Sequence, residues 1–391
     1  MKSPLNHKEK HHYNFLKKDI IRFHFSPNKS SVFFYLTCLI LTILLCFHVL
    51  YYPKTLNYTP NSIQYNQTKT FIQPQKGSEN CDLFKGKWIR EERETLYTNY
   101  SCKTIPFLKN CFLHGRKDTD FLHWNNSKFV ISQVETPKSI EKDPEDRFAT
   151  WEFPKHNFTL MVFWSQFLVT ATERVINGTT TGGFDLHLDK IDTRWSEKLP
   201  LMDYAIFSDA HWFFRQNYLY EGGKLIGCIY CQGPNVTDLG PALAIRRAFR
   251  AAFQAINNCT NCRKIFALLR TYSPSHFENG TWNTGGGCNR TLPVGKEEAN
   301  SDGWEYRKIQ VEEIEIARNS GEESGNNFEV LDVTEIMAMR PDGHPGVHWG
   351  NRWMKGYSDC IHWCLPGPVD VWNELLLEVT KRRIDLSLEK L

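Results

Sequence analysis

The residues of this chain that could do chemistry are Asp359 and His362, three positions apart in the segment G-Y-S-D-C-I-H-W-C-L-P-G-P. A carboxylate beside an imidazole fixes the tautomer of the ring and stabilises its protonated form, which a general base serving a hydroxyl group requires. Cys360 and Cys364 are interleaved with the pair and could clamp its geometry, and Trp363 could contact a substrate. The alternative interpretation is a surface turn with a solvated histidine.

A second candidate segment is D-A-H-W at residues 209–212, directly after a predicted strand at residues 204–208. Residues at a strand end face the cleft of a parallel sheet, so His211 and Trp212 could contact a substrate. Plain packing of a strand-end aromatic is an equally good interpretation.

A third candidate is the loop of residues 340–350, which is rich in Pro and Gly and contains Arg340 and His344. Such loops often form a wall of a binding site, although a folded connection without ligand contact fits equally well. Metal binding by Asp342, His344 and His348 is conceivable from the residue types, but their spacing matches no recognised metal site. We therefore predict no metal.

Alternating strands and helices must position these segments. We predict strands at residues 158–164, 204–208, 265–270 and 328–333, and helices at residues 241–257, 303–318 and 370–381. This alternation predicts an α/β fold with a mostly parallel sheet flanked by helices. The D-x-x-H loop follows the last strand and precedes the last helix, which is where sites form in such sheets.

The helix predicted at residues 241–257 is amphipathic. Its apolar residues recur at helical spacing, and Arg246, Arg247 and Arg250 lie away from them. The simplest interpretation of these arginines is a solvated helix face.

The N-terminal part of the chain predicts a membrane anchor. Residues 1–31 are polar and basic, residues 32–52 are apolar over about the length of one bilayer-spanning helix, and residues 53–80 form a polar stem without apolar periodicity. The basic flank should stay cytosolic, leaving the rest in a lumen. A cleaved signal peptide is the alternative, but no small-x-small cleavage site follows the apolar run.

Composition restricts the class of protein. The net charge of +3 does not indicate a nucleic-acid partner. Ten of the 12 cysteines lie beyond the apolar run, and ten N-glycosylation sequons accompany them, which together indicate disulfides in an oxidising lumen. The C-x-x-C pairs Cys228/Cys231 and Cys259/Cys262 also permit structural zinc, which we consider the weaker interpretation.

Longer motifs resemble a known family. They are C-D-L-F-K-G-K-W at residues 81–88, N-C and G-R within residues 110–116, R-P-D-G-H-P at residues 340–345 and the D-x-x-H segment. Together they resemble the plant trichome birefringence-like family, Golgi polysaccharide O-acetyltransferases with an SGNH-hydrolase-like fold. The amino-acid sequences of several segments are most similar to those of the xyloglucan-acetylating branch.

The resemblance implies a domain plan and partners. Residues 81–133 correspond to a small cysteine-containing module and residues 134–391 to the acyltransferase domain. It further implies a single-pass type II Golgi membrane protein with its catalytic domain in the lumen. The implied substrate is a cell-wall polysaccharide, with xyloglucan favoured. No bound cofactor or metal is implied, but an acetyl donor is required.

One departure from the family pattern concerns the nucleophile. In the family, a few dozen residues with a Gly-Asp-Ser motif lie between a tryptophan similar to Trp124 and the S-x-V-E-T-P segment found here at residues 132–137. In this chain N-N-S-K-F-V-I follows Trp124 directly, and Gly-Asp-Ser occurs nowhere in the 391 residues. We expect none of Ser127, Ser132, Ser208 and Ser358 to replace the missing serine well.

The resemblance assigns roles and leaves alternatives. His362 would be the general base and Asp359 would orient it, in a Ser-His-Asp acyl-enzyme mechanism impaired by the absent serine. One alternative is an inactive, membrane-anchored polysaccharide-binding protein. Another is a splice product or faulty gene model of an active enzyme.

Overall fold

The structure is a computed structural model that describes residues 82–90, 95, 97–102, 105–125, 138–142, 147–231, 235–299, 302–321, 325–351 and 356–388. The predicted tail, anchor and stem at residues 1–80 lie outside the described residues. In the part of the chain that the structure describes, no helix is both long and apolar enough to cross a membrane.

A parallel sheet of three strands carries the candidate site segments. Its strands are β8 (Tyr204–Phe207), β11 (Phe266–Arg270) and β12 (Asn327–Leu331), in the order β12-β11-β8. The central strand is apolar on both faces, as a strand covered on both sides must be. Ala267 and Leu269 join one buried cluster, and Phe266 and Leu268 join a second. The three strands confirm the sequence predictions at these positions.

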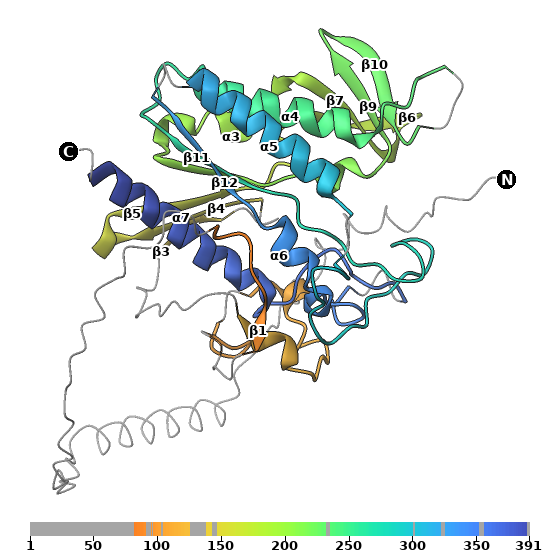
Figure 1. Cartoon of the computed structure of the whole chain (residues 1–391). Coiled ribbons are helices and arrows are strands. Elements are labelled where there is room, and N and C mark those ends of the chain that lie inside the picture. Colours follow the sequence, from red (N-terminus) through yellow and green to blue (C-terminus); the bar gives the residue numbers. More distant parts are fainter. Residues whose placement is uncertain are drawn as a thin grey trace, which may run out of the picture. The chain divides into compact units, whose positions relative to one another are not determined.

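Helices cover both faces of this sheet (Figure 1). On one side lie α4 (Gly240–Asn257) and α5 (Trp304–Gly321), and on the other lie α6 (Thr334–Ala338) and α7 (Val371–Leu388). Pro241 fits the first turn of α4 because its missing N–H has no partner there in any helix. The three predicted helices are therefore confirmed, and α7 extends seven residues beyond the predicted end.

The basic face of α4 was predicted wrongly. Arg246 and Arg250 do not face water alone, because both donate to the buried carboxylate of Glu313 on α5, with Arg250 Nε at 2.8 Å and Arg246 Nη1 at 3.0 Å. A buried carboxylate needs such partners to offset its desolvation. The arginines therefore join two helices rather than form a solvated surface.

A second, mixed sheet precedes α4. Its order is β10-β9-β7-β6, and only the β7–β9 pair is parallel. The strands are β6 (Val169–Ile176), β7 (Thr179–Ile191), β9 (Asn217–Glu221) and β10 (Lys224–Ile229). Two hairpin turns explain the antiparallel pairs: Asn177 and Gly178 both have positive φ, as do Gly222 and Gly223. Among the described strands, the expectation of a parallel sheet therefore holds for β12-β11-β8, whereas this second sheet is mixed.

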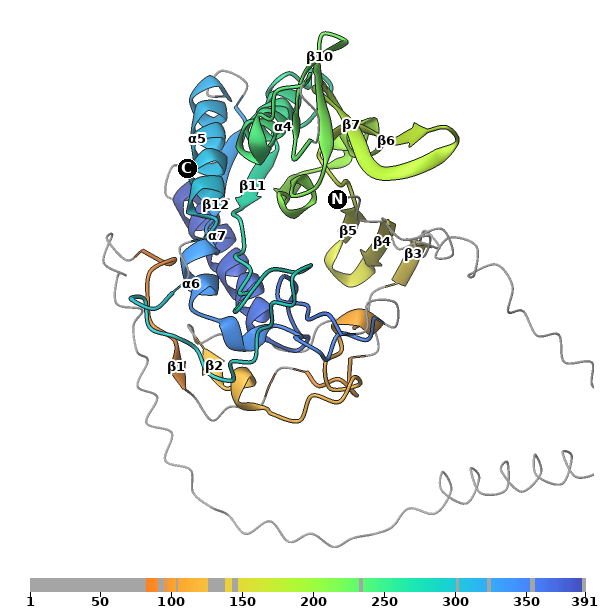
Figure 2. The ribbon, with the colours of Figure 1, turned by 90° about the vertical axis from the view of Figure 1, so that its right-hand side faces the viewer.

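The strand predicted at residues 158–164 exists but pairs differently. It is β5 (Phe158–Phe163), which lies antiparallel to β4 (Phe148–Phe153) in a meander with β3 (Lys138–Lys142). Figure 2 shows this meander as a separate unit from the parallel strands.

The short elements are β1 (Ile89–Arg90), β2 (Trp124–Asn125), α3 (Thr193–Ser196) and the 3-10 turns η2 (Phe107–Lys109), η3 (Asp120–Leu122), η4 (Pro154–His156), η5 (Leu199–Leu201), η6 (His211–Phe213), η7 (Pro341–Gly343) and η8 (Pro368–Asp370).

The described part of the N-terminal cysteine module packs against the rest of the domain. Leu83, Phe84 and Trp88 contact the apolar cluster beneath α6 and α7. The indole N–H of Trp88 donates to the carbonyl of Ile336 at 2.9 Å. The module therefore closes one side of the core that supports the loops described below.

Candidate active site

Asp359 and His362 form a hydrogen-bonded pair. Oδ2 of Asp359 lies 2.8 Å from Nδ1 of His362. The side chain of Asp359 is 3% exposed, whereas the imidazole side chain of His362 is 56% exposed. Oδ1 of Asp359 also accepts the backbone N–H groups of Ile361 and His362, at 3.2 and 2.9 Å. These contacts leave Nε2 as the ring nitrogen of His362 available to a hydroxyl group.

Two disulfides and a backbone bridge hold the loop that carries this pair. Cys360 pairs with Cys288, and Cys364 pairs with Cys111. Asp359 forms two backbone hydrogen bonds with Gly346, at 2.8 and 3.0 Å. Cys360 and Cys364 therefore lie in disulfides that clamp this loop, as the sequence analysis suggested. A short chain segment fixed at this many points holds its side chains in one arrangement.

In the other two disulfides the cysteines are three positions apart in the sequence. Cys228 pairs with Cys231, and Cys259 pairs with Cys262. The C-x-x-C units are disulfides in this structure, which was the favoured interpretation. Among the described residues, no group of three or more His, Cys, Asp and Glu side chains is arranged to hold a metal ion.

The electrostatics of Asp359 fit a carboxylate that orients a base. Burial alone raises its pKa, but the hydrogen bond and charge of His362, with the charge of Lys109, lower it well below the ordinary value of 3.8. Asp359 therefore stays ionised at neutral pH. An ionised carboxylate can accept from Nδ1–H of the ring, which leaves a lone pair on Nε2.

His211 and Trp212 lie after the end of β8 in η6, as the sequence predicted. The ring of His211 stacks on Tyr272, with centroids 4.6 Å apart, and Trp212 meets Trp164 edge to face at 5.3 Å. Burial, together with the charges of Arg270 and His362, lowers the pKa of His211 to about 3. The ring is therefore neutral, and its buried Nε2 has no hydrogen-bond partner among the described residues.

The backbone before His211 adopts an unusual conformation. Ala210 has φ 156° and ψ −40°, a region that glycine enters far more readily than alanine. Its N–H donates to Oδ1 of Asp209 at 2.7 Å. Asp209 is buried, and burial raises the pKa of its carboxyl group well above the ordinary value.

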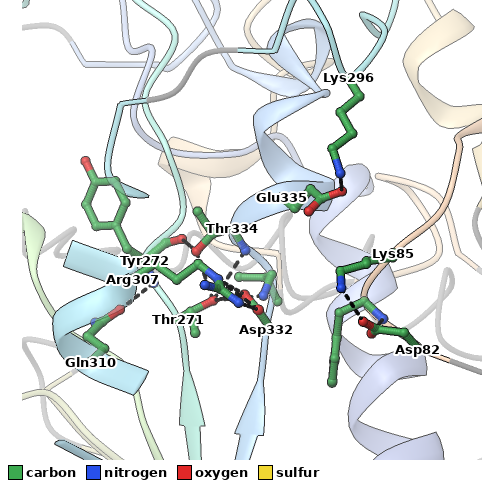
Figure 3. Close-up of polar contacts among 12 residues, drawn as sticks. Asp82, Lys85, Thr271, Tyr272, Lys296, Arg307, Gln310, Asp332, Thr334 and Glu335 are labelled. Atoms are coloured by element: carbon green, nitrogen blue, oxygen red, sulfur yellow. Dashed lines mark hydrogen bonds and ion pairs between the residues drawn. The ribbon is translucent and has the colours of Figure 1, made fainter. Parts of the chain in front are cut away.

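A polar network joins the segments that follow β11 and β12 to α5 (Figure 3). The hydroxyl of Thr271 donates to Asp332 at 3.0 Å, and Arg307 holds the same carboxylate. Gln310 accepts the N–H of Tyr272 at 2.7 Å and donates to the carbonyl of Asp209 at 3.0 Å. The network therefore fixes the loops that follow β8 and β11 relative to each other.

Three residues predicted to contact substrate are instead buried: Arg340 is 0% exposed, His344 3% and Trp363 7%. Arg340 forms a two-point ion pair with Asp342, and its guanidinium lies over the ring of Trp88 at 4.3 Å. The structure therefore gives these three side chains packing contacts, not a surface that a polysaccharide could reach. Their sequence signal was a constrained loop, which serves either purpose.

The sheet next to the site has an open edge. β8 pairs with β11 on one side, and among the described strands none pairs with its other side. Tyr204 and Ile206 on β8 are 51% and 50% exposed, and Leu160 and Val162 on β5 are 43% exposed. Apolar side chains in the interior strands of an α/β sheet are normally covered.

No described serine is an obvious nucleophile for His362. The hydroxyl of Ser208 accepts from Nε of Arg270 at 2.7 Å, and the hydroxyl of Ser273 accepts from the indole of Trp363 at 3.1 Å. Ser127 and Ser132 lie outside the described residues. The site therefore contains a base with its orienting carboxylate but no described hydroxyl paired with that base.

Two family models match the chain. The first is PC-Esterase, described as a GDSL/SGNH-like Acyl-Esterase family found in Pmr5 and Cas1p, over residues 129–379. The second is the PMR5 N terminal Domain, over residues 79–127. The two matches meet where the sequence lacks the expected nucleophile segment.

Curated relatives match most of the chain. It is 49% identical over 384 residues to "Xyloglucan O-acetyltransferase 4" of Populus trichocarpa, covering 88% of this chain and 90% of the relative. It is 45% identical over 359 residues to "xyloglucan O-acetyltransferase 2" of Arabidopsis thaliana, covering 81% and 86%. It is 36% identical over 348 residues to "Protein trichome birefringence-like 20" of Arabidopsis thaliana, covering 78% and 72%.

The coverage of the first relative bears on the missing segment. The alignment with this relative is 384 positions long, but the aligned part of this chain, 88% of it, contains fewer residues than that. At some positions of the alignment the relative therefore has a residue and this chain has a gap. The relative therefore contains residues without a counterpart here.

Proposed function

This chain belongs to the PC-Esterase family and, within it, to the trichome birefringence-like O-acetyltransferases, and on that premise we propose that it acts on xyloglucan with an impaired catalytic apparatus. The observation that carries the proposal is the Asp359–His362 pair, held at 2.8 Å on a loop with two disulfides. Two relatives that match at 49% and 45% identity have names that specify xyloglucan as the substrate.

The role of His362 in the proposal is that of a general base. Its Nε2 would take a proton from a hydroxyl group while Asp359 holds Nδ1–H and stabilises the charged ring. In the full mechanism a serine would attack the acetyl donor, and the resulting acetyl-serine would pass its acetyl group to a sugar hydroxyl activated by the same base. The base and its orienting carboxylate are present in this chain.

The impairment follows from the missing serine. Without it, acetyl transfer would require direct attack by the sugar hydroxyl, for which the described residues offer a base but no covalent intermediate. We infer that transfer is slow or absent. The same observation favours a second candidate function, a polysaccharide-binding protein that performs no transfer.

The cellular setting is also part of the proposal. We place the protein in the Golgi membrane as a single-pass type II protein with an N-glycosylated luminal domain. The support is the apolar run at residues 32–52, its basic flank and the sequons. In sealed microsomes, the luminal domain should resist protease and lose mass on deglycosylation. Digestion of this domain in sealed vesicles would overturn the assignment of topology.

The functional test is acetyl transfer to oligosaccharides. The full chain is assayed with xyloglucan, xylan, mannan and pectin oligosaccharides, and His362→Ala serves as the control. Slow transfer that prefers xyloglucan and disappears in the variant supports the enzyme. Binding of xyloglucan without transfer supports the second candidate. Robust transfer that depends on His362 would contradict the proposed impairment.

A further inference from the structure

Two buried histidines lie directly behind His362. His276 is 7% exposed and His344 is 3% exposed. The ring of His344 stacks on Trp363 with centroids 4.1 Å apart, and the indole N–H of Trp363 donates to Ser273 at 3.1 Å. The proposed mechanism uses neither histidine, so their burial next to the base requires another explanation.

The two rings form a chain of three hydrogen bonds. Nδ1 of His344 lies 2.6 Å from the backbone carbonyl of His362. Nε2 of His344 lies 2.7 Å from Nδ1 of His276. Nε2 of His276 lies 2.9 Å from the carbonyl of Ala338. The chain therefore connects the backbone of the base to the end of α6.

Counting protons gives the charge of this pair. A carbonyl oxygen only accepts, so Nδ1 of His344 and Nε2 of His276 must both carry a proton. The contact between the rings needs a third proton, because two lone pairs at 2.7 Å would repel. Two neutral imidazoles carry only two protons in total. The geometry therefore requires one additional proton, and hence one positive charge.

The surroundings limit the pair to one charge. Burial lowers the pKa of both rings and opposes any charge on the pair, so the single charge follows from the hydrogen bonds alone. Burial together with a charge on His276 lowers the pKa of His344 to about 3. A doubly charged pair is therefore excluded. Asp342, Asp302 and Asp359 favour a positive charge on these rings, whereas Arg290 and His362 oppose it.

We propose that His276 and His344 form a singly charged pair that holds three protons on four ring nitrogens and positions His362 through its backbone carbonyl. The charge also acts on the base. A cation close to His362 repels a proton on that ring and so offsets the attraction of Asp359. The pair therefore favours the neutral ring that a general base needs. This consequence rests on the proposed role of His362, whereas the charge of the pair does not.

The test measures the reactivity of His362 rather than acetyl transfer, so it is independent of the proposed function. Diethyl pyrocarbonate modifies deprotonated imidazole, and peptide mass spectrometry of the full chain gives the pH at which His362 is half reactive. His276→Asn places an amide donor near the position of Nδ1 and removes the charge. We expect this midpoint to rise by about one pH unit, from the loss of one charge several ångströms away. The control is His348→Asn. His348 lies in the loop of His344, but its ring is hydrogen-bonded to the backbone carbonyl of His114, so this change should leave the midpoint of His362 where it is.

A second variant covers the case in which His276→Asn fails to fold. His344→Asn keeps a donor for the carbonyl of His362 and also removes the charge, so it should raise the midpoint in the same direction. An unchanged midpoint in a folded variant of either histidine would mean that the pair is neutral, and would overturn the proposal.

Discussion

Trp164 and Trp212 meet edge to face with ring centroids 5.3 Å apart, which brings the carboxyl ends of β5 and β8 together although the two strands belong to different sheets. Trp164 follows β5 directly, and Trp212 lies in the turn after β8. Both strands expose apolar side chains. A parallel strand inserted between them would therefore end beside these indoles, next to His211.

We predict that Asp359→Asn destabilises the protein at neutral pH by about 1–3 kcal/mol, because Asn has one acceptor oxygen and its NH2 group cannot replace the oxygen that accepts from Nδ1–H of His362 while the other accepts the backbone N–H groups. The effect depends on pH. The pKa of Asp359 is lowered in the folded state, so its contribution to stability is present above its ordinary value of 3.8 and is lost as the pH falls below that value. Urea unfolding at several pH values should show the variant and the parent converging in acid.

The control for this change is Asp203→Asn. Asp203 forms an exposed ion pair with Arg263 at 3.1 Å, and such pairs contribute little to stability. A difference between Asp359→Asn and the parent that stayed constant from neutral to acid pH would show that the carboxylate is not held by the imidazole.

We predict that Ala210→Gly stabilises the protein by about 1 kcal/mol. Alanine at φ 156° and ψ −40° carries backbone strain that glycine relieves. The matched control is Ala205→Gly on β8, at an extended position in the same core cluster, which should destabilise by about 0.5–1 kcal/mol. Opposite signs in denaturant midpoints are the expected result. Destabilisation by both changes would mean that Ala210 is not strained.

The disulfide between Cys288 and Cys360 closes a loop with a sequence separation of 72 residues. Changing both cysteines to Ser should therefore lower the free energy of unfolding by about 4 kcal/mol. The same change of Cys259 and Cys262, which are three residues apart, should cost about 2 kcal/mol. Thermal melting ranks the two variants. Mass mapping of unreduced peptides checks the pairings first, and free thiols at Cys288 and Cys360 would contradict the structure.

The elements predicted from sequence were those with a long apolar period or a continuous buried run. α4 shows this, because Ile245, Phe249 and Phe253 recur on one face, and β11 does too, because Phe266–Arg270 is almost wholly apolar. The hairpin at Asn177 and Gly178 was missed, although Asn-Gly between apolar alternations is a strong turn signal. Local sequence patterns therefore predicted the parallel strands β8, β11 and β12, but not the antiparallel hairpin of β6 and β7.

The pairing of Asp359 with His362 was predictable because the two residues are close in sequence, so that a short loop determines their geometry. The burial of Arg340 and His344 was not predictable, because it depends on Phe121, Trp88 and His276, which lie far from them in the chain. Side chains of the same types in the same loop could equally have faced a substrate. Tertiary packing alone decides between the two outcomes.

The last prediction concerns the open edge of β8. We expect that inserting a family-like Gly-Asp-Ser block between Trp124 and Ser132 raises the melting temperature and restores acetyl transfer. An added strand beside β8 would use its unpaired backbone groups and cover Tyr204 and Ile206, which are about half exposed. Domains are stable by only about 5–15 kcal/mol, so a missing sheet strand consumes much of that margin. Differential scanning calorimetry and transfer to xyloglucan oligosaccharides are the two measurements.

A matched variant separates the structural from the chemical contribution of the block. A Gly-Asp-Ala block should raise the melting temperature as much as the Gly-Asp-Ser block, since the strand is the same, but should leave transfer at the level of the parent chain. Restored transfer should also disappear with His362→Ala, because the serine hydroxyl then lacks its base. If the Gly-Asp-Ala chain transferred acetyl as fast as the Gly-Asp-Ser chain, the inserted serine would not be the nucleophile. If neither block raised the melting temperature, the edge of β8 would not be the position of a missing strand.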